Sequence, residues 1–552
     1  MTNHNNNRKM IKQMLMVMAM SLTAIEVMAD GQDTLKYRVS LTDKNATEYS
    51  LSKPKEFLSA KAIERRKRQG LAIDSTDLPV CRTYVEQIQK VGVKVVVTGK
   101  WENFVTVSTN DPAIADQIAA LPFVRSVERV WIAPKPKQMP DMMMMGGGRP
   151  GQQPQGGQRP EGGQQPQGGQ RPQAGQQPPQ GGQQPQAGQQ PQGGQRPEGG
   201  QQPQAGQQPQ GGQRPQGGRP GGRRRFPRPG ERDSLENIVV VHPDSLYGTA
   251  ITQIQLSNGD KLHEAGFRGQ GMTIAVVDAG FHNVDSMAAM QNLHILGSKD
   301  FVDPTSNTYA AGRHGTSVLS CIGMNKPYEM VGTAPEASFW LLRSEDEASE
   351  HLVEQDYWAA AVEFADSVGV DVINTSLGYN TSDDPDVTYE LRYLDGRTAL
   401  ISRQAARLAA KGIVLTCSAG NSGSDSWKKI TSPADADNIL TVGAVDDKAV
   451  LASFSSIGHS ADGRVKPDVV AIGKGSSVMG SNGNQGKANG TSFSAPIMCG
   501  LVTCLWQACP TLTAKELIEL VRQSGDRAAY PDNIYGYGVP DMWKAYQTYL
   551  NK

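Results

Sequence analysis

A long stretch with no apolar side chains other than alanine and proline divides this chain of 552 residues. Between Gly146 and Arg225 the sequence is a loose repeat of GGQQPQ with AGQQPQ and GGQRPE variants. Such a segment buries too little apolar surface to offset the entropy lost on ordering. Its glycines do not recur at every third position, which excludes collagen. We therefore predict a disordered linker over 138–233, and we interpret it as a flexible spacer rather than a tether to a wall or polyanion.

The first residues have the pattern of a secretory signal peptide. Arg8, Lys9 and Lys12 precede the apolar run MLMVMAMSLTAI, and Val27-Met28-Ala29 has the small-x-small form of a cleavage site. The run is much shorter than the roughly 20 residues that span a bilayer. We expect residues 1–29 to be removed and the protein to be secreted, without a membrane span, to the periplasm, the cell surface or the medium.

Residues 30–137 have the pattern of a small α+β domain. Short alternating or apolar stretches indicate strands, and periodic segments between them indicate helices. The expected strands cover 37–41, 93–98, 104–108 and 124–131, and the expected helices cover 59–70, 84–91 and 111–121. The first of these helices carries the basic run Arg65-Arg66-Lys67-Arg68, which we interpret as a solvent-exposed face.

Residues 234–552 alternate apolar strand candidates with helical segments. Strands are expected over 273–277, 338–342, 370–374, 413–417 and 439–442, and helices over 316–322, 355–368 and 397–411. This alternation predicts an α/β domain with a doubly wound parallel sheet and helices on both faces. In such sheets the reactive groups gather at the carboxyl ends of the strands.

Two polar residues stand at positions of this kind. Asp278 follows the strand over 273–277 directly, in VVDAGF, and a carboxylate there either caps a turn or takes part in chemistry. His314 opens a helical segment in RHGTSV and is one of only eight histidines. A lone histidine is more often structural than catalytic, so neither residue decides the function by itself.

Ser492, in NGTSFSAP, is the third candidate, and an apolar run rich in helix formers follows it. A hydroxyl at the start of a helix lies beside backbone N–H groups and the positive end of the helix dipole, which stabilise an oxyanion. Pro496 fits the first turn of that helix, where a missing N–H costs nothing. Gly-Thr-Ser is also common in turns and caps. The order Asp278, His314, Ser492 matches a known chain order of the orienter, base and nucleophile of a catalytic triad.

The motifs VVDAG, HGTSV, NTSLG, SAGNSG and GTSFSAP occur in this order, and through them residues 247–550 resemble the subtilisin family of serine peptidases. The resemblance implies that Ser492 is the nucleophile, that His314 is the general base and acid, and that Asp278 orients the imidazole. It implies a secreted serine endopeptidase that cleaves peptide bonds through an acyl-enzyme on Ser492.

The same resemblance assigns residues to the oxyanion hole and to substrate binding. Asn421 would donate from its side chain to the oxyanion, beside the backbone N–H of Ser492. Ser376-Leu377-Gly378 and Ser418-Ala419-Gly420 would border the primary specificity pocket, and the first segment would also pair with extended substrate. After HGT the chain has Ser317-Val-Leu-Ser in place of the second histidine and small residues that subtilisins commonly have, a departure that leaves the triad intact.

Residues 30–137 resemble a subtilase propeptide, which acts as a folding chaperone and inhibitor and is then cleaved away. The stretches SPADADNILTVGAVD and DGRVKPDV are most similar to subtilases exported by Bacteroidetes-type bacteria. The long Gly/Pro/Gln linker departs from that pattern. We expect maturation between residues 225 and 247, and the arginine run at 223–225 is a further candidate for a processing site.

Metals and other partners have little support in the sequence. No acidic cluster matches the calcium loops of the family, so calcium is left open, and no CxxC or HExxH pattern suggests zinc. No cofactor is required by the implied reaction. The 55 basic and 55 acidic residues balance, which gives no reason to expect nucleic acid. The expected partners are protein or peptide substrates and the chain's own propeptide, with the enzyme a monomer.

The six cysteines do not form a disulfide framework, because Cys81 precedes the linker and leaves an odd number after it. Cys504 and Cys509 are the only pair that we consider for a bridge, and the others fit small buried hydrophobes. An alternative hypothesis from another class is a non-catalytic surface protein whose working part is the repeat. Its function would survive mutation of Ser492.

Overall fold

The computed structural model of the chain describes residues 34–133 and 245–552. The expected signal peptide and the repeat linker lie outside the described residues. In the part of the chain that is described, no helix is both long and apolar enough to cross a membrane.

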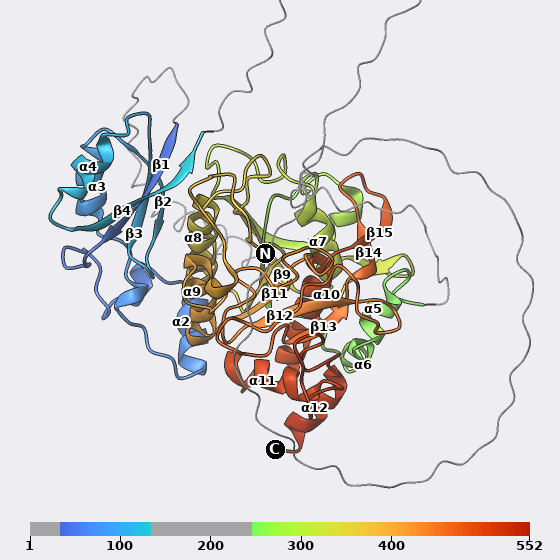
Figure 1. Cartoon of the computed structure of the whole chain (residues 1–552). Coiled ribbons are helices and arrows are strands. Elements are labelled where there is room, and N and C mark those ends of the chain that lie inside the picture. The colour runs from blue at the N-terminus through green and yellow to red at the C-terminus, as the bar shows by residue number, and fades with distance from the viewer. Residues whose placement is uncertain (1–33, 134–244) are drawn as a thin grey trace, which may run out of the picture. The chain divides into compact units, whose positions relative to one another are not determined.

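A seven-stranded parallel sheet organises residues 245–552 (Figure 1), with the strand order β13-β12-β11-β10-β5-β9-β6. Its strands are β5 (Thr273–Asp278), β6 (His294–Asp300), β9 (Ser338–Arg343), β10 (Val372–Thr375), β11 (Val414–Ser418), β12 (Leu440–Val445) and β13 (Val469–Ile472). This confirms the predicted parallel α/β sheet. We did not identify the two edge strands from the sequence. β6 is only partly buried and lacks a continuous apolar run, whereas β13 has an apolar run, VVAI, that we did not assign.

Helices cover both faces of this sheet because alternate residues of its buried strands point to opposite sides. Ile274 and Val276 of β5 belong to the same apolar cluster as the residues of α7 and α10, whereas Ala275 and Val277 belong to the cluster of α8 and α9. Figure 1 shows α8 and α9 on one side of the strands and α10 on the other. The helices are α5 (Ile251–Gln255), α6 (Gly259–Glu264), α7 (His314–Gly323), α8 (Val353–Val368), α9 (Leu400–Arg407), α10 (Thr491–Ala508), α11 (Ala514–Ser524) and α12 (Met542–Leu550).

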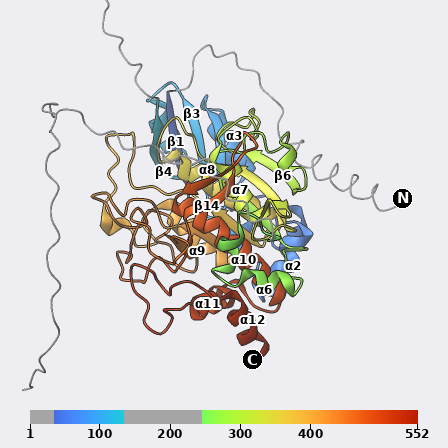
Figure 2. The same cartoon turned by 90° about the vertical axis from the view of Figure 1, so that its right-hand side faces the viewer.

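Helix α10 begins earlier than the sequence suggested. It starts at Thr491, so Pro496 lies more than one turn inside it, and the expectation that Pro496 occupies the first turn is wrong. A hairpin of β14 (Lys474–Met479) and β15 (Gln485–Asn489) leads into this helix, and a smaller one joins β7 (Asn325–Lys326) to β8 (Met330–Val331). At the other end of the domain α12 packs against both α10 and α11 (Figure 2).

Residues 34–133 form a four-stranded antiparallel sheet with the order β2-β3-β1-β4. One face of this sheet packs Val105 and Val107 against the helices, and the other packs Phe104, with Trp101, into the apolar cluster that contains α8. The elements are β1 (Leu35–Leu41), α2 (Ala60–Arg68), α3 (Arg82–Gln89), β2 (Lys94–Gly99), β3 (Phe104–Thr109), α4 (Ile114–Ala119) and β4 (Val124–Ile132).

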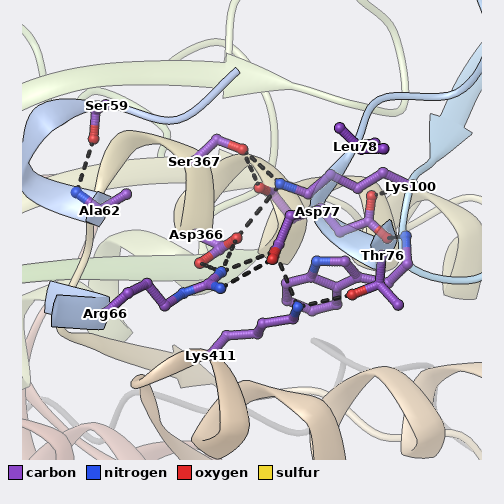
Figure 3. Close-up of polar contacts among 12 residues, drawn as sticks. Ser59, Ala62, Arg66, Thr76, Asp77, Leu78, Lys100, Asp366, Ser367 and Lys411 are labelled. Carbon is purple, nitrogen blue, oxygen red and sulfur yellow. Dashed lines mark hydrogen bonds and ion pairs between the residues drawn. The ribbon is translucent and has the colours of Figure 1, made fainter. Parts of the chain in front are cut away.

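The carboxylate of Asp366, on α8, lies where three cations of residues 34–133 meet. Arg65 and Arg66 donate to its Oδ1 from 2.5 and 2.9 Å. Lys100 Nζ lies 3.4 Å from its Oδ2 (Figure 3). Burial by itself would raise the pKa of Asp366, but the charges of Lys100, Arg65 and Arg66 outweigh burial and lower the pKa to about 2. The buried charges therefore compensate one another.

The same network corrects our interpretation of the basic helix. Arg65 and Arg66 are only 2% and 1% exposed, so this half of the basic run is buried, whereas Lys67 and Arg68 are exposed as we expected. Arg66 also donates to both carboxylate oxygens of Asp77, from 3.1 and 3.0 Å, and Lys411 lies 3.0 Å from Asp77 Oδ1 (Figure 3). The sequence shows the cations but not their acceptor Asp366, which lies 300 residues further along the chain from Arg66.

Two further carboxylates of α8 accept hydrogen bonds from residues 34–133. Glu363 accepts the backbone N–H groups of Lys100 and Trp101 from 2.5 and 2.9 Å. Asp356 accepts from Arg38 Nε at 2.6 Å and from Thr106 Oγ1 at 2.7 Å. Helix α8 thus supplies acceptors, and residues 34–133 supply the donors.

We expect Asp366→Ala to destabilise the full chain strongly, because it leaves the buried Arg65 without a counter-charge and takes one of two carboxylates from the buried Arg66. Breaking a buried ion pair in this way lowers the free energy of unfolding by about 3–5 kcal/mol. The control is Glu86→Ala, which breaks the exposed pair between Arg82 and Glu86, 58% and 47% exposed, and should change the free energy of unfolding by less than about 1 kcal/mol. Urea unfolding measures both. Equal effects of the two substitutions would contradict the role of Asp366.

Glu363 predicts a pH dependence of stability. Burial raises its pKa from 4.5 to about 7, against the opposing charge of Lys100. The folded chain therefore binds more protons than the unfolded chain between these values, so this group makes the free energy of unfolding fall as pH rises from 4.5 to 7. Unfolding of wild type and Glu363→Gln across this range tests the effect. The difference between their free energies of unfolding should change with pH in that window and level off above it. A difference that stays constant with pH would refute the raised pKa of Glu363.

Candidate active site

Asp278 and His314 form a hydrogen-bonded pair at the carboxyl edge of the sheet. Asp278 is the last residue of β5 and is 2% exposed. Its Oδ1 accepts the backbone N–H of Ala279 and lies 2.8 Å from Nδ1 of His314, the first residue of α7. A carboxylate only accepts, so Nδ1 carries the hydrogen. In the neutral ring Nε2 is then the nitrogen able to accept a proton.

Gly315 allows α7 to begin so close to the end of β5. A Cβ atom at this position would lie 2.4 Å from the carbonyl oxygen of Gly280 and 3.0 Å from Cβ of Asp278. Any larger residue would push the helix away from the strand. The glycine of the HGT motif therefore sets the approach that brings His314 to Asp278.

The start of α10 lies near His314 because α7 packs against α10. Ser492 is in the first turn of α10 and is 8% exposed. The next residue, Phe493, has its ring centre 5.9 Å from that of the His314 imidazole, at an angle of 48°. Ser492 Oγ donates to the carbonyl oxygen of Ser376 at 3.4 Å.

Asn421 is tied to the start of the same helix. Its Oδ1 accepts the backbone N–H of Thr491 at 2.8 Å and the hydroxyl of Thr491 at 3.0 Å. These bonds identify the oxygen end of the amide, so Nδ2 is the end turned away from Thr491. A Cβ atom at Gly490 would lie 3.6 Å from this Nδ2. The amide donor is therefore held beside the chain that leads into Ser492.

The two segments expected to bind substrate follow neighbouring strands, since β10 pairs with β11. The hydroxyl of Ser418 donates to the carbonyl oxygen of Leu377 at 3.3 Å and joins the segments 376–378 and 418–420. The N–H of Gly420 donates to Thr491 Oγ1 at 3.1 Å, which links the second segment to α10. Hydrogen bonds thus connect the three motifs NTSLG, SAGNSG and GTSFSAP, while Asp278 and His314 of the other two motifs bond to each other.

Sequence reasoning missed a pair of residues near this edge. The hydroxyl of Tyr379, which follows the first of these segments, donates to Oε1 of Glu345, which comes shortly after the end of β9. Burial above all raises the pKa of Glu345, and the neighbouring charges of Glu350 and Asp278 add to this. Nothing in the stretch SEDEASE marks one carboxylate as buried, because its partner lies on a different strand connection.

Metal ligands and disulfides do not add to the site in the described residues. No group of three or more His, Cys, Asp or Glu side chains in residues 34–133 and 245–552 is arranged to hold a metal ion. All six cysteines are free and buried, including Cys504 and Cys509, the pair we considered for a bridge. Burial raises the pKa of the Cys509 thiol to about 12 and that of Cys504 as well. These are packed thiols rather than reactive ones.

Known proteins resemble both described parts of the chain. A family model described as the subtilase family matches residues 269–538, and one described as the peptidase S8 propeptide domain of Bacteroidota matches residues 36–141. Subtilisin NAT of Bacillus subtilis subsp. natto is 31% identical over 281 residues, which cover 50% of this chain and 65% of that protein. This chain thus spans just under two thirds of the length of that relative.

A second relative is covered more fully. Subtilisin of Bacillus pumilus is 30% identical over 281 residues, which cover 50% of this chain and 90% of that protein. The solved structure of the MycP3 protease from the type VII (ESX-3) secretion system is 22% identical, with a TM-score of 0.45, over 58% of this chain and 93% of that chain. From the family match and the Bacillus pumilus relative it follows that this chain belongs to the subtilase family.

Proposed function

We propose that the chain is the precursor of an exported serine endopeptidase that cleaves protein substrates with Ser492 as its nucleophile. The observation that carries this proposal is the 2.8 Å contact between His314 Nδ1 and Asp278 Oδ1 beside the first turn of α10. It supplies an oriented base next to a serine, which is the arrangement that nucleophilic catalysis by a hydroxyl needs. Membership of the subtilase family supports the same reaction.

In the proposed reaction His314 transfers one proton during acylation and one during deacylation. Ser492 Oγ attacks the peptide carbonyl carbon while His314 Nε2 accepts the hydroxyl proton. The imidazolium then gives this proton to the leaving amine as the C–N bond breaks, and an acyl-enzyme remains. Water then attacks the acyl-enzyme while His314 accepts its proton, and His314 returns this proton to Ser492 Oγ as the acyl group leaves. Asp278 keeps the proton on Nδ1 and stabilises the imidazolium, so that no cofactor is needed for these steps.

The oxyanion would accept hydrogen bonds from Asn421 Nδ2 and from the backbone N–H of Ser492. Support for Asn421 comes from its two bonds to Thr491, which fix the amide before the reaction begins. The segments 376–378 and 418–420 would hold extended substrate and border the pocket for the side chain before the cut. Calcium remains an open proposal that this reaction does not require.

The precursor form is supported by the propeptide match and by the contacts of residues 34–133 with α8. We propose that this domain is removed by cleavage between residues 225 and 247. Export is proposed from the signal-peptide pattern of residues 1–29, which resembles that of secreted proteins.

We predict that Ser492→Ala abolishes the hydrolysis of casein while the fold is kept. The loss in kcat should be about 10⁶-fold, the size known for the nucleophile of subtilisin itself. The matched control is Ser286→Ala, which removes an exposed serine hydroxyl bonded to Asn283 and should leave the rate unchanged. Circular dichroism checks that both variants fold. Casein hydrolysis by Ser492→Ala at the rate of the control would refute the proposed function.

Asn421→Asp tests the oxyanion donor separately. Aspartate keeps an oxygen that accepts from Thr491 but replaces the Nδ2 donor by an acceptor. We expect kcat to fall by at least about 10²–10³-fold with little change in KM, the cost of losing one such donor in subtilisin. Steady-state kinetics on a peptide anilide measure both constants. A kcat within tenfold of wild type would show that Asn421 does not serve the oxyanion.

A further inference from the structure

We propose that Ser376 is a positioning residue that holds the peptide group of Ser492 through a hydrogen bond that the helix itself cannot make. The proposal rests on the proposed function, because it concerns the same nucleophile. It gives Ser376 a task distinct from binding substrate.

Pro496 removes a hydrogen bond from the first part of α10. In an α-helix the carbonyl of Ser492 would accept the N–H of the residue four positions later, which is residue 496. Proline has no N–H, and its ring crowds the carbonyl four residues before it. The carbonyl of the proposed nucleophile is therefore left without its helical donor, although α10 continues from Thr491 to Ala508.

The hydroxyl of Ser376 fills this place. Its Oγ donates to the carbonyl oxygen of Ser492 at 2.9 Å. Ser376 comes directly after β10, so the bond ties α10 to the carboxyl edge of the sheet, where Asp278 also stands. A donor from the sheet thus replaces a donor from the helix.

The direction of the Ser376 hydroxyl is fixed by a chain of buried polar groups. Asn374 Nδ2 donates to Ser376 Oγ at 3.0 Å, and Thr416 Oγ1 lies 3.3 Å from Asn374 Oδ1. Asn374 and Thr416 are 0% exposed, and Ser376 is 6% exposed. Because Ser376 Oγ already accepts from Asn374, its single hydrogen is directed to Ser492. The arrangement extends from β11 through β10 to the nucleophile.

The contact affects the groups that would react. Ser492 Oγ donates to the carbonyl oxygen of Ser376 at 3.4 Å, so the two residues face each other through both of these bonds. Rotation of the Ser492 backbone would move its side chain relative to His314 and its N–H relative to Asn421. Errors of about 1 Å in such positions cost roughly 100-fold in rate.

The test is a pair of substitutions in which the second restores what the first removes. Ser376→Ala deletes the donor from the sheet, and Pro496→Ala supplies a backbone N–H to the same carbonyl. For Ser376→Ala in the full-length chain we expect kcat per titrated active site to fall by roughly 10–100-fold, with KM changed less than threefold. Pro496→Ala alone should stay near wild type. The double variant should recover at least most of the lost kcat.

Comparison variants separate positioning from folding and from substrate binding. Ser418→Ala removes a buried hydroxyl that donates to Leu377, and Pro496→Ala should not rescue it. If Ser376→Ala does not fold, Asn374→Ala removes the group that directs Ser376, and its loss of kcat should also be reduced by Pro496→Ala. Normalising to titrated sites excludes a loss that reflects only fewer folded molecules.

The proposal is overturned if Ser376→Ala keeps kcat within twofold of wild type, or if the double variant is as slow as Ser376→Ala. A rise in KM without a fall in kcat would overturn it as well and assign Ser376 to substrate binding alone. These outcomes are distinct from failure of the proposed function, in which Ser492→Ala itself would stay active.

Discussion

The ends of three neighbouring strands at one edge of the parallel sheet are the constraint on which the site depends. β10 pairs with β5 and with β11, and all run in the same direction. Asp278 therefore ends its strand beside the segment that begins with Ser376, and Asn421 follows the next strand along. Helices α7 and α10 bring His314 and Ser492 to this edge because they pack on the same face of the sheet. A shift in the register of these strands would therefore move the site residues at their ends apart from one another.

A second set of interactions joins α8 to residues 34–133 through buried charge. The carboxylates of Asp356, Glu363 and Asp366 accept from donors of the domain that matches the propeptide model. Buried ion pairs seldom add much net stability, but an unpaired buried charge is costly. The network therefore favours one docked arrangement over others, and water would have to hydrate these carboxylates if the proposed cleavage released the domain. This set does not include Asp278, His314 or Ser492, so the contacts of the domain with α8 and the proposed chemistry use different side chains.

The sequence predicted the parts of this structure that depend on residues close together in the chain. Apolar runs predicted the interior strands, and short motifs at their ends predicted residues that the structure connects by hydrogen bonds, such as Thr491 with Asn421. It did not predict contacts between residues far apart in the chain. The basic run of α2 gave no sign of Asp366, and Glu345 gave no sign of Tyr379. The predicted place of Pro496 in the first turn of α10 was wrong, because the start of this helix is set by packing and by Asn421 rather than by the proline.

The claim that Asp278, His314 and Ser492 act as one catalytic unit is tested most directly by covalent labelling. The purified protein is treated with a fluorophosphonate, and the modified peptide is identified by mass spectrometry in wild type, His314→Ala and Ser286→Ala. The account predicts one adduct on Ser492 in wild type and in Ser286→Ala, and a very slow or undetectable reaction in His314→Ala. An adduct on another serine, or equal labelling of Ser492 without His314, would contradict it.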